Sequence, residues 1–273
     1  MSDVSVIIPT WNRAATLEKV VRSALAQTLP PLEVLVCDDG STDDSREIIE
    51  AICDSRVKWI EGPRGGRPAI PRNRGIRESR GEWLAFLDDD DEWLPEKLER
   101  QIAAIKASGG LACCSNALRF IPGRGSVGPY LTATNTTLTF NDLLKVNQVI
   151  CSSAIIHNSL VSSVLGFPED EHLKAWEDYA LWLRIATQTN FTFVAEPMLV
   201  YLDDAASSVR NEQVNVCAQR RAVFNNFKRW GKEHGVSSSY LRSATNQWLS
   251  DLLSCATDKL MQRAGKLKKT LLS

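Results

Sequence analysis

Short apolar segments alternate with segments of helical period through the first 115 residues of the chain. The apolar segments have the composition of strands that are buried on both faces of a sheet. They are Val4 to Ile8, Leu32 to Cys37, Val57 to Ile60, Trp83 to Leu87 and Leu111 to Ser115. Repeated alternation of strand and helix predicts right-handed crossovers and an α/β fold with a mostly parallel central sheet.

Polar or acidic turns follow three of these segments, at residues 9–12, 38–43 and 88–91. The carboxyl ends of parallel strands meet at one edge of a sheet, which is where α/β proteins bind ligands. The four adjacent carboxylates Asp88 to Asp91 repel one another unless water, a cation or hydrogen-bond donors compensate. A hard divalent cation with phosphate oxygens would suit this place. A solvated acidic turn before the helix that begins at Pro95 is the alternative.

Composition narrows the class of protein. A length of 273 residues fits one large domain, or a domain with an extension. The net charge of −1 offers no general attraction for nucleic acid. Seven cysteines, an odd number without a Cys-x-x-Cys pair, favour reduced thiols in a cytoplasmic protein over a disulfide framework or a zinc site. The start of the chain lacks the features of a signal peptide, and no apolar run approaches the roughly 18 residues of a membrane span.

The second half of the chain is less regular. Residues 121–139 are rich in Gly, Pro, Ser and Thr and predict an irregular, mobile loop that could cover a site. Residues 173–185 have helical spacing, with Glu177 and Asp178 in the first turn, where free backbone N–H groups favour anions. Simple helix-end electrostatics is therefore an alternative to a chemical role for these two acids.

Beyond Val209 the chain reads as basic helices with apolar residues. We therefore expect a main domain over residues 1–205 and a C-terminal helical extension over residues 206–273. The apolar residues could dock on the main domain, and the basic face could touch anionic lipid. An ordinary solvated face is the alternative. We expect a cytoplasmic protein with possible peripheral contact to the inner face of the cell membrane.

Six segments, taken in order, resemble family 2 glycosyltransferases with the GT-A fold. They cover about the first 200 residues, and six in sequence are far more specific than any one of them. The segments are Val6 to Arg13, Val36 to Asp43, Arg72 to Gly75, Gly81 to Asp91 with Pro95, Trp176 to Arg184, and Glu196 to Tyr201. The resemblance implies a Rossmann-like nucleotide-sugar-binding domain. It also implies an inverting transfer of a sugar from a nucleoside diphosphate donor, by default UDP, to a saccharide or glycolipid hydroxyl in polysaccharide or glycoconjugate synthesis.

The resemblance also assigns roles to residues. Trp11 would cover the donor base and Asp39 would accept its hydrogen bonds. Asp89 and Asp91 would hold Mn²⁺ or Mg²⁺ as the ends of an Asp-x-Asp motif, with Asp90 near the ribose or donor sugar and Asp88 serving structure at the strand end. Asp178 would be the general base. The remaining donor-site residues would be Pro9, Thr10, Asn12, Arg72 and Asn73, and Trp176 and Glu177 would lie on the acceptor side.

The chain departs from the family after Tyr201. Many relatives continue with Arg and then His, whereas this chain reads Leu202-Asp203-Asp204. Arg64, Arg67, Arg72 or Arg210 could supply the missing positive charge, and Asp203 or Asp204 could add a metal ligand. The departure keeps open a non-catalytic nucleotide-sugar-binding module that recruits a partner through its C-terminal helices. A third alternative is a metal-dependent phosphohydrolase that uses the Asp cluster. It is weaker because it gives no role to Asp39 or to the helix that contains Glu177 and Asp178.

Overall fold

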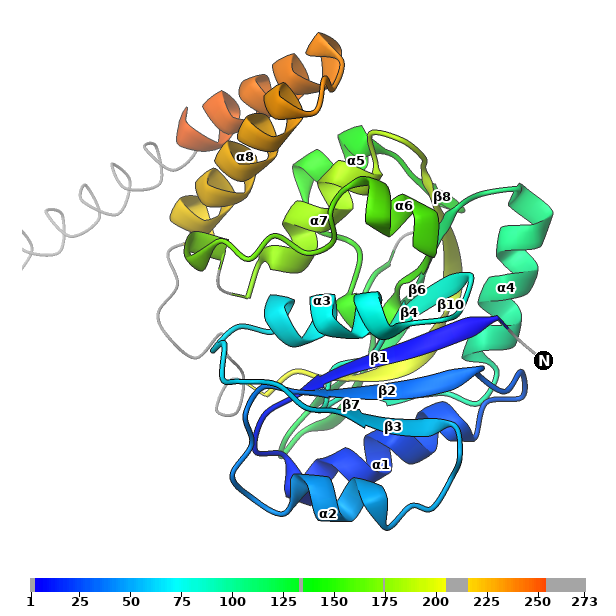
Figure 1. Cartoon of the computed structure of the whole chain (residues 1–273). Helices are drawn as coiled ribbons and strands as arrows, with labels where there is room; N and C mark the ends of the chain where they lie inside the picture. Colours follow the sequence, from blue (N-terminus) through cyan, green and yellow to red (C-terminus); the bar gives the residue numbers. More distant parts are fainter. Residues whose placement is uncertain (1–2, 133–134, 174, 205–215, 254–273) are drawn as a thin grey trace, which may run out of the picture. The chain divides into compact units, whose positions relative to one another are not determined.

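The computed structural model describes residues 3–132, 135–173, 175–204 and 216–253 (Figure 1). The chain forms two compact units, Met1–Asn211 and Glu212–Ser273. The first unit is built on one ten-stranded sheet with the order β3-β2-β1-β4-β9-β6-β10-β5, to which β7 adds beside β6 and β8 beside β10.

The first four strands are parallel and correspond to the predicted strands. They are β1 (Val4–Thr10), β2 (Glu33–Asp38), β3 (Val57–Ile60) and β4 (Trp83–Phe86). In β1, Val6 and Ile8 belong to the core cluster that contains Leu17 and Val20 of one covering helix. Ile7 points to the other face, where a Cβ on Gly75 would approach its side chain. Burial on both faces is what the continuous apolar segments predicted.

Later strands make the complete sheet mixed. β9 (Ile155–His157) is antiparallel to both β4 and β6 (Ala112–Ile121), whereas β10 (Phe191–Leu202) is parallel to β6. β5 (Glu92–Trp93) and β8 (Thr137–Leu138) are antiparallel to β10. The expectation of a mostly parallel sheet therefore holds for β1 to β4, and each antiparallel pair named here involves a strand of only two or three residues.

The segment predicted as an irregular loop contains regular structure. β7 (Gly125–Pro129) pairs antiparallel with β6, and a tight turn closes with the Arg124 amide donating to the Ile121 carbonyl at 3.0 Å. Gly123 and Gly125 adopt φ values of 77° and 74°, which favour glycine. The glycines that suggested irregularity are thus the residues that allow a hairpin.

Helices cover both faces of the sheet. Figure 1 shows α1 (Ala14–Leu25) and α2 (Ser45–Glu50) on one face of β1–β3 and α3 (Ala69–Glu78) on the other. α4 (Lys97–Ser108) contributes Leu98 and Ile105 to the core shared with α1. The shorter elements are α5 (Phe140–Lys145), α6 (Asn158–Ser163), α7 (Glu177–Ile185) and the 3₁₀ turns η1 (Cys151–Ser153) and η2 (Glu171–Leu173).

The second unit contains α8 (Val216–Glu233) and a further helix over residues 238–253. Arg220 pairs with Asp251 at 2.7 Å, and the Lys228 ammonium lies 4.7 Å from the centre of the Trp248 ring, so the two helices contact each other. Within the described residues, no helix has the length and apolar character required to cross a membrane. Five described cysteines are free, but Cys217 is disulfide-bonded, so the expectation of reduced thiols is wrong at that position.

Candidate active site

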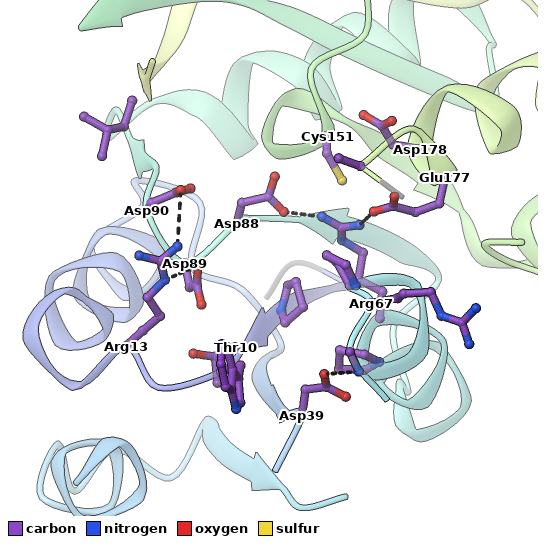
Figure 2. Close-up of a pocket in the computed structure, with 18 of the residues that line it drawn as sticks. Thr10, Arg13, Asp39, Arg67, Asp88, Asp89, Asp90, Cys151, Glu177 and Asp178 are labelled. Carbon is purple, nitrogen blue, oxygen red and sulfur yellow. Dashed lines mark hydrogen bonds and ion pairs between the residues drawn. The ribbon is translucent and has the colours of Figure 1, made fainter. Parts of the chain in front are cut away.

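A cavity of about 370 Å³ lies at the carboxyl edge of β1, β2 and β4. The polar turns predicted to share this edge do meet there, because parallel neighbours place their carboxyl ends together. Figure 2 shows side chains from all three turns around the cavity, together with residues from the start of α7. The lining includes Pro9, Thr10, Trp11, Arg13, Asp39, Arg64, Arg67, Arg72, Asp88, Asp89, Asp90, Cys151, Ala175, Glu177, Asp178, Tyr201 and Leu202.

One end of the cavity is formed by Trp11 and Asp39. Asp39 is almost fully buried, and its carboxylate accepts hydrogen bonds from the amides of Gly65 and Gly66 at 2.7 and 2.8 Å. The same carboxylate pairs with the Arg64 guanidinium, whose central carbon lies 3.6 Å from the centre of the Trp11 ring. An aromatic face and a buried acceptor therefore adjoin, and Arg64 contacts both.

The opposite side is organised around Arg72 of α3. Its side chain is 5% exposed and donates to Glu177 of α7 and to Asp88 after β4, each at 2.6 Å. Asp88 and Glu177, both labelled in Figure 2, therefore share one guanidinium. Arg72 thus connects three separate elements. A buried charge that loses its partner is costly, so this arrangement is a rigid wall of the cavity.

The four consecutive acids are not equivalent. Asp88, Asp89 and Asp90 line the cavity, whereas Asp91 is 1% exposed and accepts from the Leu202 amide at 2.9 Å. The Asp-x-Asp spacing fits 88 and 90 as well as 89 and 91, and the cavity is lined by both members of the first pair but only by Asp89 of the second. Asp88 thus faces the cavity, whereas the family resemblance assigned the metal-binding role to Asp91. The Asp91 carboxylate instead binds the backbone at the end of β10.

Arg13 compensates part of the acidic charge, and sequence reasoning missed it. Its Nε atom lies 3.4 Å from Asp89, and its Nη2 atom lies 4.0 Å from Asp90. Burial raises the pKa of Asp89 to about 7; Arg13 opposes this rise and the neighbouring Asp90 adds to it. Arg13 directly follows Asn12 in the first polar turn, which is the signal that could have identified it.

The carboxylates of Asp88, Asp89 and Asp90 are the hard oxygen ligands that Mg²⁺ and Mn²⁺ accept. Among the described residues, no three metal-ligating side chains are already gathered as a cluster. Such ions often use one or two carboxylates together with substrate phosphates, so a complete protein cage is not required. The pKa of Asp89 is raised mainly by burial of the carboxyl and further by the neighbouring Asp90, and a cation beside it would favour the charged form. The donor set is therefore compatible with a divalent cation shared with a ligand.

Asp178 lies in the first turn of α7 and lines the cavity beside Glu177 and Cys151 (Figure 2). Its Oδ1 atom accepts from the Tyr179 amide at 2.6 Å, which orients the carboxylate. Ala175, just before the helix, has a φ of 60°, an unusual value for a residue other than glycine. Backbone of this kind occurs often where a functional side chain must be held in place.

Three other predicted residues do not line the cavity. Asn12 accepts from the Thr42 amide at 2.8 Å and ties the turn after β1 to the turn after β2. Asn73 exchanges two 2.8 Å hydrogen bonds with the backbone of Phe167 and holds the turn before η2. Trp176 is the residue before α7, and its ring centre lies 6.0 Å from that of Tyr179.

Most of the arginines suggested as substitutes for the missing Arg and His after Tyr201 lie at the cavity. Arg64, Arg67 and Arg72 line the cavity, whereas Arg210 lies outside the described residues. Asp203, suggested as an extra metal ligand, pairs with Arg119 and does not line this cavity. Tyr201 and Leu202 do line it, although the sequence offered no role for their side chains. Cys151 also contributes, without a sequence signal.

Comparisons with known proteins agree with the resemblance. The family model described as "Glycosyl transferase family 2" matches residues 5–165. The Escherichia coli protein "UDP-Glc:alpha-D-GlcNAc-diphosphoundecaprenol beta-1,3-glucosyltransferase WfaP" is 32% identical over 188 residues, covering 69% of this chain and 72% of that protein. "Putative teichuronic acid biosynthesis glycosyltransferase TuaG" of Bacillus subtilis strain 168 is 28% identical over 185 residues, covering 67% of this chain and 71% of the relative.

A solved structure shows the same fold. The crystal structure of residues 1–349 of S. aureus TarS in complex with UDP-GlcNAc superimposes with a TM-score of 0.76. The match covers 93% of this chain and 73% of that one, at 21% sequence identity. At this identity the likeness concerns the fold alone.

Proposed function

The chain belongs to glycosyltransferase family 2, and on that premise we propose that it transfers a sugar from a UDP-sugar donor to a saccharide or glycolipid hydroxyl, with inversion at the anomeric carbon. One observation carries the proposal: Trp11 with Asp39, the acids Asp88 to Asp90, and Asp178 all line a single cavity. These groups suit the three tasks of the reaction, which are holding a base, neutralising a diphosphate and accepting a proton.

The donor base would bind between Trp11 and Asp39. A flat ring can stack on the indole, and an N–H of the base can donate to the buried carboxylate. UDP is the donor carrier that we favour, because WfaP is named as a UDP-Glc transferase and the TarS structure contains UDP-GlcNAc.

The diphosphate would lie against Asp88, Asp89 and Asp90 through a shared Mn²⁺ or Mg²⁺ ion. When bound, the ion neutralises charge that develops on the leaving diphosphate. Arg13 keeps Asp89 and Asp90 in place. Arg67, which also lines the cavity, can add positive charge on the phosphate side, where the chain lacks the usual Arg and His after Tyr201.

Asp178 would act as the general base. The acceptor oxygen bonds to the anomeric carbon while the bond from that carbon to the phosphate oxygen breaks, and the hydroxyl proton passes to Asp178. A single displacement of this kind inverts the centre and needs one carboxylate opposite the leaving group, as in inverting hydrolases. Glu177 is less suited to this role because Arg72 holds it in an ion pair.

The acceptor is proposed by analogy. WfaP is named for an acceptor in which GlcNAc is linked to undecaprenol through a diphosphate. We infer a lipid-linked or cell-surface saccharide acceptor for this chain, in polysaccharide or glycoconjugate synthesis at the inner face of the membrane. α8 carries three exposed basic residues, Arg221, Arg229 and Lys232, which could approach anionic headgroups.

The test is a transfer assay with UDP-Glc or UDP-GlcNAc and a short-chain GlcNAc-diphospholipid. Asp178→Asn should lower transfer by about 10²-fold or more and leave UDP affinity within about twofold, because a general base contributes about 10²–10⁴-fold. Glu171→Gln, a carboxylate-to-amide change at an exposed position outside the cavity, is the control. Unchanged turnover in Asp178→Asn would remove it as the base. UDP binding without turnover for any nucleotide sugar would favour the non-catalytic module.

Dependence on the cation is measured separately by titrating UDP calorimetrically with and without Mn²⁺. UDP should bind more tightly with Mn²⁺, and Asp90→Ala should remove most of that difference. Equal affinity with and without the ion in the unmodified protein would reject the metal assignment.

A further inference from the structure

The slot assigned to the donor base is occupied by a side chain of the protein itself. The Arg64 guanidinium is centred 3.6 Å from the Trp11 ring and pairs with the Asp39 carboxylate. A guanidinium is planar, stacks on aromatic faces and donates N–H groups to carboxylates. A nucleobase in this slot would use the same aromatic face and the same acceptor.

The Arg64 side chain can leave the slot without leaving the buried Asp39 carboxylate unpaired. Its side chain is 43% exposed, whereas that of Asp39 is 4% exposed. When the guanidinium departs, Asp39 keeps the amides of Gly65 and Gly66 as donors at 2.7 and 2.8 Å. The carboxylate therefore stays partly compensated until a base N–H replaces the arginine.

Backbone packing holds the loop while the side chain is free to move. Gly40 has a φ of 79°, and a Cβ at that position would lie 2.9 Å from the Arg64 amide nitrogen. The close approach positions the Arg64 backbone beside the turn after β2. The guanidinium, at the end of a long flexible side chain, can swing out while the Gly65 and Gly66 amides stay on Asp39.

We propose that Arg64 is an internal competitor of the donor nucleobase, bound between Trp11 and Asp39 in the nucleotide-free protein and displaced when the base binds. The inference rests on the proposed function. If only a fraction of the protein has the slot open, the apparent affinity for the ligand is the intrinsic affinity multiplied by that fraction. Because the cost of moving Arg64 is the same for every base, removing it should tighten all nucleotides by one common factor.

The experiment titrates UDP and CDP, in the presence of Mg²⁺, into the intact protein and into Arg64→Ala. The two nucleotides are a matched pair that differs only on the base edge expected to face Asp39. Arg64→Ala should bind each about tenfold more tightly, which corresponds to about 1.4 kcal/mol, given one stacked cation and one half-exposed ion pair. Arg64→Lys should fall between the two, because an ammonium keeps the charge but lacks the flat face.

Arg77→Ala, on the exposed side of α3, is the control and should bind UDP like the unmodified protein. Melting curves establish that each variant is folded. Unchanged or weaker UDP binding in Arg64→Ala would overturn the inference, as would tightening factors that differ clearly between UDP and CDP, because Arg64 would then contact the bound base. If no variant binds UDP, CDP, dTDP or GDP, the proposed nucleotide-sugar function fails and the inference fails with it.

Discussion

Two arginines face the same cavity and differ in how firmly they are held. The Arg72 side chain is 5% exposed and pairs with two carboxylates, Asp88 and Glu177. The Arg64 side chain is 43% exposed and pairs with one, Asp39. Removing a partner from a buried pair costs several kcal/mol, whereas half-exposed pairs are weak. Arg72 is therefore a fixed part of the cavity wall, and Arg64 can exchange with a ligand.

Lys97 extends the comparison to a buried cation without an acidic partner. It is fully buried, its ammonium lies 4.1 Å from the centre of the Trp93 ring, and it has no hydrogen-bond partner among the residues that the structure describes. Burial lowers the pKa of Lys97 to about 7. Where Arg72 stays charged between two anions, the lowered pKa of Lys97 lets its amine lose the proton at a far lower pH than an exposed lysine would.

The largest expected effect is a loss of stability, and it tests whether Arg72 is a fixed part of the cavity wall. Arg72→Met should lower the free energy of unfolding by about 3–5 kcal/mol, because two carboxylates lose their shared buried partner. Urea unfolding measures the change. Arg77→Met on the same helix removes an exposed arginine and should shift stability by less than about 0.5 kcal/mol. A loss below about 1 kcal/mol for Arg72→Met would show that the two arginines do not differ as described.

Replacing Lys97 should have the opposite effect and stabilise the protein. Lys97→Met should raise the free energy of unfolding at pH 7 by about 2 kcal/mol, because a buried amine is replaced by an apolar side chain of similar length. Lys106→Met, exposed on the same helix, is the control. A destabilised Lys97→Met variant would mean that the amine has a partner that the structure does not show.

The pH dependence provides a second measurement on Lys97. Its pKa falls from 10.5 to about 7 on folding, so the unfolded chain binds more protons between these values. The free energy of unfolding should therefore rise as the pH increases from about 7 to 10.5, because Lys97 becomes less unfavourable in the folded protein. Lys97→Met should remove this slope. Unfolding curves at pH 7, 8.5 and 10 test this. Equal slopes in both proteins would contradict the lowered pKa.

A double-mutant cycle sharpens the account of Arg72. Glu177→Gln removes one of its partners, so combining it with Arg72→Met should cost less than the sum of the single changes by about 1–2 kcal/mol. Additive effects would indicate that the pair at 2.6 Å contributes no coupling.

The smallest expected loss of stability follows the replacement of Arg64, the arginine that can exchange with a ligand. Arg64→Ala should lower the free energy of unfolding by no more than about 1.5 kcal/mol, because its ion pair is half-exposed, it stacks on one ring and Asp39 retains two amide donors. A loss as large as that of Arg72→Met would mean that Arg64 is structural and cannot leave for a base.

Much of the fold and part of the site could be predicted from the sequence. The apolar segments predicted the parallel strands, and their acidic ends predicted one shared edge, because strand direction alone determines where those ends lie. Trp11, Asp39, Arg72, Glu177 and Asp178 accordingly line the cavity. Local patterns failed for β7, where glycines that suggested irregularity close a hairpin, and for the short antiparallel strands, whose pairing partners are distant in the chain.

The sequence by itself determined which residue types gather at the sheet edge, since the alternation of strands and helices directs each polar turn to the same side. Only the tertiary structure decided which atoms face the cavity. Asp91 turns inward to the Leu202 amide while Asp88 faces Arg72, a choice set by packing against β10 and α3. The contact between Arg72 and Glu177 joins residues 105 positions apart, and the position of Arg64 between Trp11 and Asp39 requires two separate turns to meet. Such contacts depend on long-range packing, which no local pattern contains.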